Sequence, residues 1–145
     1  MFRASHFWTG STADAAFTRD AVASAPGKPS IPLTTGAADL ATPGRWNPED
    51  TLGASIAQCQ TLTFLALAGK VRSDVRAIRT EVTLELETVD KVTRVSRITL
   101  EATITVAAGS DPEKTAAMYE KAHKYCYIAN SLNSEIVLRP TVVVA

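Results

Sequence analysis

The sequence has no net charge and no long uninterrupted apolar run. Fifteen Lys and Arg residues balance fifteen Asp and Glu residues, so no excess of charge favours nucleic acid or an anionic membrane surface. No stretch reaches the roughly 18 consecutive apolar residues of a membrane span, and no apolar h-region follows a basic start. We therefore expect a cytoplasmic protein that binds neither nucleic acid nor membrane.

Cysteine and histidine are also scarce, with two residues of each in the chain. Cys59 and Cys126 lie far apart in the sequence and show no local spacing of metal ligands. Two cysteines in a domain of this size are not a disulfide scaffold, and in a reducing compartment such a pair is more often buried, redox-active or metal-binding. We expect no metal site.

The length and apolar content are those of a globular protein with a real core. The chain has 145 residues, of which 46% are apolar, and this is enough for one domain to bury a core. The sequence therefore predicts a single domain over residues 1–145.

The N-terminal third alternates short apolar segments with turn-forming residues. Strands are expected over Phe2–Thr9 and Ala15–Ala23. The segment Pro26–Gly44 holds four prolines and three glycines, which favours irregular backbone with at most a short edge strand near Ser30–Thr34. A connection of this length suggests a functional loop rather than a simple linker.

A strong helix-start signal follows this loop. Asn47 supplies an N-cap acceptor, Pro48 fits the first helical position, and the carboxylates of Glu49 and Asp50 face the positive end of the helix dipole. The predicted helix runs to about Ala68 and stops at Gly69. Its apolar residues spread around more than one face, so we expect the helix to be buried on nearly all sides.

The rest of the chain predicts three strands and a second helix. Residues 81–87 and 98–106 alternate apolar with polar side chains, which is typical of half-solvated antiparallel strands, with a turn near Asp90. A second helix begins at Asp111 and Pro112 and leads toward Cys126. A last strand is expected over Glu135–Val144, interrupted by Pro140.

Polar side chains surround Cys59 in the long helix. Gln58 and Gln60 flank it, while Ser55 and Thr63 lie one turn away on either side. A free cysteine is usually a small buried hydrophobe, but a polar stripe in an otherwise apolar helix is not what packing alone would favour. The pattern raises Cys59 as a candidate reactive thiol.

The run Trp46–Cys59, which opens Trp-Asn-Pro-Glu-Asp, and the run Ala122–Asn133 around Cys126 resemble the OsmC/Ohr family of thiol-dependent hydroperoxide reductases. The resemblance covers nearly the whole chain. It implies an OsmC-like α+β fold, in which antiparallel sheets wrap a long buried cysteine-bearing helix, and an intertwined homodimer with active sites at the subunit interface.

The resemblance also implies a chemistry. Cys59 would attack an organic hydroperoxide and become a sulfenic acid, and Cys126 would resolve it as a disulfide. An external dithiol, in the family often a lipoyl protein, would regenerate the thiols. No metal or flavin is implied.

The family stabilises its thiolate with an arginine that the Asn-Pro-Glu glutamate orients, here Glu49. Arg19 and Arg45 both compete for that role, and we favour Arg19 because a residue of the second strand or its loop can reach over a partner helix. Glu49 and Cys59 are ten residues apart on one helix, about 15 Å by helical rise. Glu49 is therefore expected to serve the cysteine of an antiparallel second subunit.

Two residues depart from the family pattern. Trp46 stands where many relatives have a small residue, and Tyr127 stands where many have proline. Two other functions stay open: a small-molecule binding protein that has lost peroxidase turnover, and a redox sensor whose disulfide is a signal. His123 is taken as an ordinary helical histidine.

Overall fold

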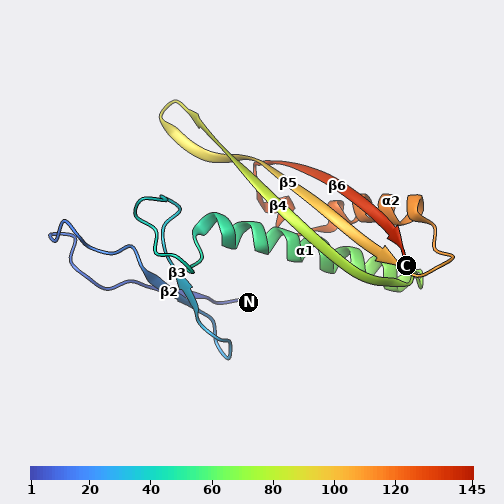
Figure 1. The fold of residues 1–145 in the computed structure, drawn as a ribbon, viewed down its shortest axis with the longest axis horizontal. Coiled ribbons are helices and arrows are strands. Elements are labelled where there is room, and N and C mark those ends of the chain that lie inside the picture. The colour runs from blue at the N-terminus through green and yellow to red at the C-terminus, as the bar shows by residue number, and fades with distance from the viewer. The chain divides into compact units, whose positions relative to one another are not determined.

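The computed structural model describes residues 1–145 and divides into two compact units, Met1–Leu52 and Gly53–Ala145. Each unit holds one three-stranded sheet, with the strand order β1-β2-β3 in the first and β4-β5-β6 in the second (Figure 1). Strands and helices are mixed along the chain, as the α+β prediction requires.

The N-terminal sheet is small and antiparallel. It consists of β1 (Ser5–Phe7), β2 (Ala21–Ser24) and β3 (Ile31–Leu33). The short edge strand expected near Ser30–Thr34 is confirmed, and Pro32 is tolerated there because an edge strand does not need every N–H donor.

The two strands predicted before β3 are shorter than expected, and β2 in particular does not begin at Ala15. The backbone N–H of Ala16 donates to Asp14 Oδ1 at 2.9 Å, and the N–H of Asp20 donates to Thr18 Oγ1 at 2.9 Å. These local bonds offer the backbone an alternative to strand pairing. The segment therefore turns, and β2 starts only at Ala21.

Helix α1 (Pro48–Lys70) begins where the sequence predicts. Asn47 Oδ1 accepts the backbone N–H of Asp50 at 2.7 Å, and Asp50 Oδ2 accepts the N–H of Asn47 at 3.1 Å. This reciprocal arrangement is a capping box, which satisfies two backbone donors that the first turn leaves free.

The predicted stop of α1 at Gly69 is wrong, because the helix continues to Lys70. The left-handed residue that ends it is Arg72, with φ 57°. The N–H of Ser73 bonds to the carbonyl of Ala68 at 2.9 Å, and the N–H of Arg72 bonds to that of Gly69 at 3.2 Å. This is a Schellman motif with arginine in the position that usually holds glycine.

The C-terminal sheet is built from β4 (Val75–Val89), β5 (Val92–Val106) and β6 (Glu135–Val144). β4 and β5 pair antiparallel through the predicted turn, where Asp90 and Lys91 both have positive φ, as a type I′ hairpin turn requires. β6 pairs parallel to β5, and Pro140 does not interrupt it. β6 lies at the sheet edge, where a missing N–H costs no ladder bond.

One face of this sheet forms the core. Alternate residues of β5 from Ile98 to Val106 are buried, and helices α1 and α2 (Pro112–Ala122) pack against that face. Phe64 of α1 and Tyr119 of α2 meet edge to face, with ring centroids 5.5 Å apart. As predicted, Asp111 caps α2 by accepting the N–H of Lys114 at 3.1 Å.

The single chain does not bury α1 on all sides, contrary to the expectation. Its buried residues follow one face from Gly53 to Ala68, whereas Leu62 is 57% exposed and Leu65 is 39% exposed. α1 is also long and apolar enough to cross a membrane by length and composition alone. One such helix is weak evidence, because core helices of water-soluble proteins pass the same test.

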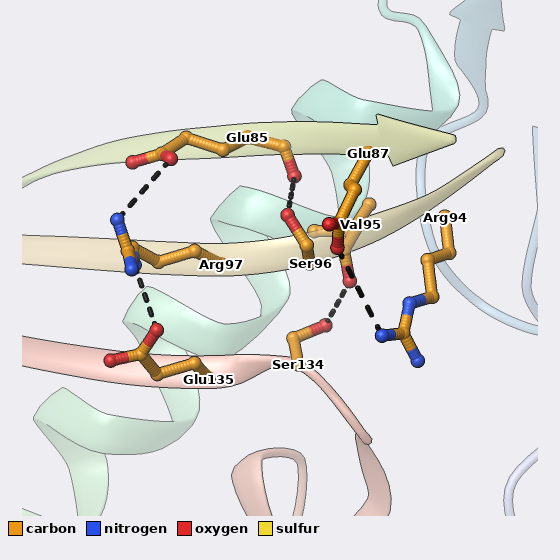
Figure 2. A network of polar contacts seen from close by, with 8 residues as sticks. All are labelled: Glu85, Glu87, Arg94, Val95, Ser96, Arg97, Ser134 and Glu135. Atoms are coloured by element: carbon orange, nitrogen blue, oxygen red, sulfur yellow. Dashed lines mark hydrogen bonds and ion pairs between the residues drawn. The ribbon is translucent and has the colours of Figure 1, made fainter. Parts of the chain in front are cut away.

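The opposite face of the sheet is polar, as predicted for the glutamates of β4. Figure 2 shows Arg97 of β5 between Glu85 of β4 and Glu135 of β6, with nitrogen to oxygen distances of 3.5 and 2.8 Å. The hydrogen bond to Glu135 is the main cause of a raised Arg97 pKa. Ser96 is left out of the β4–β5 pairing and donates to the Glu85 carbonyl instead, which marks a β-bulge (Figure 2).

Candidate active site

Cys59 lies in the middle of α1 and is partly exposed. It lines an open groove of about 1040 Å³ between one face of α1 and the segment Lys121–Asn130. Ser55 and Thr63, one turn before and after it, line the same groove. Part of the polar stripe seen in the sequence is therefore the wall of a cavity.

Cys126 follows α2 through a short 3₁₀ helix, His123–Tyr125, and is fully buried. The turn around it is held by Asn130, whose side-chain amide donates to the carbonyls of Lys124 at 3.0 Å and Cys126 at 2.9 Å. The N–H of Cys126 donates in turn to the His123 carbonyl at 3.1 Å. These bonds fix the backbone that carries the second thiol.

The fold brings the two thiols together. Both cysteines are free, and the Cys59 side chain is close enough to Cys126 to alter its titration. Burial raises the pKa of the Cys126 thiol to about 11, and the neighbouring Cys59 thiol adds to the rise. Cys126 is therefore a neutral thiol at physiological pH.

A buried tyrosine lies behind this pair. Burial raises the pKa of Tyr119 to about 12, the neighbouring Thr80 side chain opposes the rise, and nearby Cys126 adds to it. The hydroxyl of Tyr119 therefore remains protonated and uncharged beside the sulfur.

Gln60 does not belong to the groove wall, although it adjoins Cys59 in sequence. It is 1% exposed and points into the core, where its side-chain Nε2 donates to the carbonyl of Tyr119 at 2.8 Å. The polar residues around Cys59 therefore lie on two different faces of α1, one that lines the groove and one that is buried in the core.

The groove also contains a basic lining that sequence reasoning missed. Lys70, Lys121 and Lys124 line it together with Tyr125 and Tyr127, and no carboxylate does so. Tyr127, at a position where the sequence departs from its family, is 82% exposed. Lys70 could have been found, since eleven residues are close to three turns and place it on the Cys59 face of α1. The other two lysines depend on the tertiary fold.

Glu49 lies in the N-terminal unit, where it packs over Gly36 of the proline-rich loop. A Cβ atom on residue 36 would lie only 2.6 Å from Glu49 Oε2, so a larger residue there would force this carboxylate to move. Glu49 Oε2 is buried and has no hydrogen-bond partner. The chain thus holds a buried carboxylate oxygen that lacks a donor, which is a costly arrangement.

The two candidate arginines have different environments within the same unit. Arg45 Nε lies 3.4 Å from Asp20 Oδ2, so Arg45 is not simply a solvated residue near the helix cap. A hydrogen bond from Thr42 is the main cause of the lowered pKa of Asp20, and Arg45 contributes to it. Arg19 stacks over the Phe17 ring at 4.1 Å and donates to the Phe17 carbonyl at 3.0 Å. Neither arginine forms an ion pair with Glu49.

The residues around the groove are suited to thiol chemistry rather than to metal binding. No group of three or more His, Cys, Asp or Glu residues is arranged to hold a metal ion. The groove wall carries one accessible thiol, that of Cys59; the buried thiol of Cys126 lies beside it, and the protonated Tyr119 lies next to Cys126.

Solved structures share this fold. The chain is similar to an OsmC-like protein of Vibrio cholerae, with 22% identity and a TM-score of 0.87 over 97% of this chain and 99% of the other. It is also similar to the organic hydroperoxide resistance protein OsmC of Legionella pneumophila, with 18% identity and a TM-score of 0.73 over 98% and 96% of the two chains. For the organic hydroperoxide resistance protein OhrB of Bacillus subtilis the values are 18% and 0.67, over 98% of each chain.

Among proteins with curated functions, none matches the sequence significantly. The model of the family described as OsmC-like protein matches residues 41–141, which include both helices and both cysteines. The resemblance inferred from the sequence is thereby confirmed, and the chain belongs to the OsmC-like protein family.

Proposed function

We propose that this protein is a thiol-dependent peroxidase that reduces organic hydroperoxides, with Cys59 as the nucleophile and Cys126 as the resolving cysteine. One observation supports this most strongly: an accessible thiol lines a groove, and a fully buried second thiol lies beside it. The family membership and the names of the relatives from Legionella pneumophila and Bacillus subtilis agree with this proposal.

In the first step, the Cys59 thiolate attacks the distal oxygen of the hydroperoxide and the O–O bond breaks. The sulfur gains that oxygen as a sulfenic acid, and the alkoxide takes up a proton and leaves as an alcohol. In the second step the Cys126 sulfur attacks the Cys59 sulfur. Cys126 loses its proton, the hydroxyl leaves as water, and a disulfide forms.

The environments of the two thiols support this order of events. The raised pKa of Cys126 keeps it protonated, and its burial keeps it from the substrate. A thiolate is the reactive species toward a peroxide, so the exposed Cys59 acts first. An external dithiol, for example of a lipoyl protein, then supplies two electrons and two protons by thiol–disulfide exchange in the cytoplasm.

Glu49 and Arg19 complete the site in this proposal. Glu49 holds a buried oxygen without a donor, and Arg19 has no carboxylate partner, so the two can pair when the site is assembled. Ten residues of helix separate Glu49 from Cys59 in one chain, about 15 Å. Glu49 and Arg19 of one copy would therefore act on Cys59 of a second copy in a homodimer.

The uncovered side of α1 supports such a dimer. Leu62 and Leu65 expose large apolar side chains that a single chain leaves in water. Burial of apolar surface contributes about 25 cal/mol of stabilising free energy per Å², so packing a second copy on this face would stabilise a dimer.

The experiment that tests the proposed function is hydroperoxide consumption with dihydrolipoamide as reductant, compared between the wild type and Cys59→Ser. Turnover by the wild type that is abolished in Cys59→Ser supports the peroxidase. If the wild type binds or is oxidised by the peroxide without turnover, the alternatives of a binding protein or a redox sensor describe it better. The binding protein stays an alternative because neither Arg19 nor Arg45 forms an ion pair with Glu49 within one chain.

A further inference from the structure

Gln60 is an unusual residue for its position in α1. It lies on the core face of the helix between Ile56 and Phe64, both fully buried, and is itself only 1% exposed. An aliphatic residue would bury apolar surface here at no polar cost, whereas an amide must find partners. Gln60 also directly follows the proposed nucleophile Cys59.

The amide of Gln60 bonds to a carbonyl that the end of α2 leaves free. At that end the N–H of His123 donates to Glu120 and Lys121 as the helix tightens into a 3₁₀ turn, so the carbonyl of Tyr119 loses its usual helical donor. Gln60 Nε2 takes that place at 2.8 Å. The bond joins the helix of Cys59 to the turn that leads to Cys126.

The other end of the amide is unsatisfied. Gln60 Oε1 is buried and has no hydrogen-bond partner, and an unpaired buried acceptor is destabilising. A residue kept only for stability would be expected to avoid this cost. The cost of this unpaired acceptor is accepted at a position where the amide also ties α1 to α2 beside the thiol pair, which points to a role in the placement of the two helices.

We propose that Gln60 is a positioning residue for disulfide formation, an inference that rests on the proposed peroxidase function. Once Cys59 is a sulfenic acid, it has two fates. Either Cys126 attacks its sulfur and water leaves, or a second hydroperoxide oxidises it to a sulfinic acid and is itself reduced to an alcohol. The bond from Gln60 to Tyr119 favours the first fate by holding the Cys126 turn against α1.

The test is the partition of Cys59 between disulfide and sulfinic acid, measured by mass spectrometry after graded doses of cumene hydroperoxide. Gln60→Met keeps the length of the side chain but removes the donor. We expect about a tenfold larger sulfinic fraction per turnover, the effect of losing roughly one hydrogen bond. The rate of Cys59 sulfenic acid formation, trapped with dimedone, should change less than about twofold, because no group in contact with the peroxide is altered.

Thr115→Val is the matched control. Thr115 is 2% exposed and its hydroxyl donates to the Asp111 carbonyl at 2.9 Å. The variant therefore also removes a hydrogen bond of a buried side chain in α2, at the end of the helix away from Cys126. It should lower the stability without raising the sulfinic fraction. If Gln60→Met does not fold, Gln60→Asn keeps the amide but shortens its reach by one methylene and should show the same shift.

A sulfinic fraction within about twofold of the wild type in the Gln60 variants would overturn the inference, and so would an equal rise in Thr115→Val. If wild-type Cys59 forms no sulfenic acid at all, the proposed function itself fails. The two failures are distinguishable because the first leaves wild-type turnover intact.

Discussion

The side chain of Cys59 lines an open groove, while that of Cys126 beside it is fully buried. This difference in access underlies the proposed roles, in which the Cys59 thiol meets the hydroperoxide and the Cys126 thiol acts afterwards. It also links the chemistry of the site to the stability of the fold, because burial shifts the titration of Cys126 and Tyr119 in the same direction.

Stability should therefore fall at high pH. The pKa of Cys126 rises from 9.0 to about 11 and that of Tyr119 from 10.0 to about 12, so the folded state holds both protons more tightly than the unfolded state. Their contribution is complete below pH 9 and is lost between pH 9 and 12. Each shift corresponds to at most about 2.7 kcal/mol, and solvent screening reduces it.

Urea unfolding at pH 8 and at pH 10.5 measures this loss. Cys126→Ser and Tyr119→Phe should each flatten part of the decline, because each removes one titrating group. An unfolding free energy that stays constant or rises between these pH values in the wild type would contradict the shifts.

Gly36→Ala should impair the site through Glu49. The new methyl group would lie 2.6 Å from Glu49 Oε2 and force the carboxylate to move. We expect the rate of Cys59 oxidation to fall about as much as in Glu49→Gln. Gly69→Ala is the control, because a Cβ there meets nothing within 4 Å, and it should stabilise α1 by up to about 1 kcal/mol with unchanged oxidation.

Arg19→Ala should slow the oxidation of Cys59 far more than Arg45→Ala. A guanidinium beside the sulfur favours the thiolate, and Arg19 is available for this, whereas Arg45 is paired with Asp20. Arg45→Ala should mainly loosen the loop that Asp20 anchors. The pH dependence of Cys59 alkylation separates the variants. If the apparent thiol pKa rises only in Arg45→Ala, Arg45 rather than Arg19 is the activating arginine. If it rises in neither variant, the protein is better described as a binding protein.

The protein should be a dimer at micromolar concentration. Leu62→Glu would place a charge on the uncovered side of α1 and should shift the mass seen by light scattering toward the monomer. Val92→Glu, at a side chain that is 65% exposed at the β4–β5 hairpin, should leave the mass unchanged. A monomeric wild type would remove the role of Glu49 and Arg19 across the interface.

Local chemistry explains why much of the fold could be predicted from the sequence. The helix starts at Asn47 and Asp111 depend on side chains that bond the nearest backbone N–H groups, and both are present. The turn at Asp90 likewise depends on its own residues. The alternation of apolar and polar side chains predicted β5 and its buried face. This two-residue period is a property of the strand itself and does not depend on which strand it pairs with.

Tertiary placement explains the rest. The end of α1 is set by Arg72 in a left-handed conformation, which no propensity favours. Pro140 is tolerated because β6 is an edge strand, and only the complete sheet shows that β6 lies at an edge. The lysines of the groove and the bond from Gln60 to Tyr119 join segments about 60 residues apart, so no local pattern indicates them.

The central claim is that Cys59 and Cys126 form one redox pair. Its most direct test is mass spectrometry of the protein after one stoichiometric dose of an organic hydroperoxide, with free thiols blocked before digestion. We predict a disulfide between Cys59 and Cys126 within one chain and no remaining free thiol. Two free thiols, or disulfides only between chains, would contradict it.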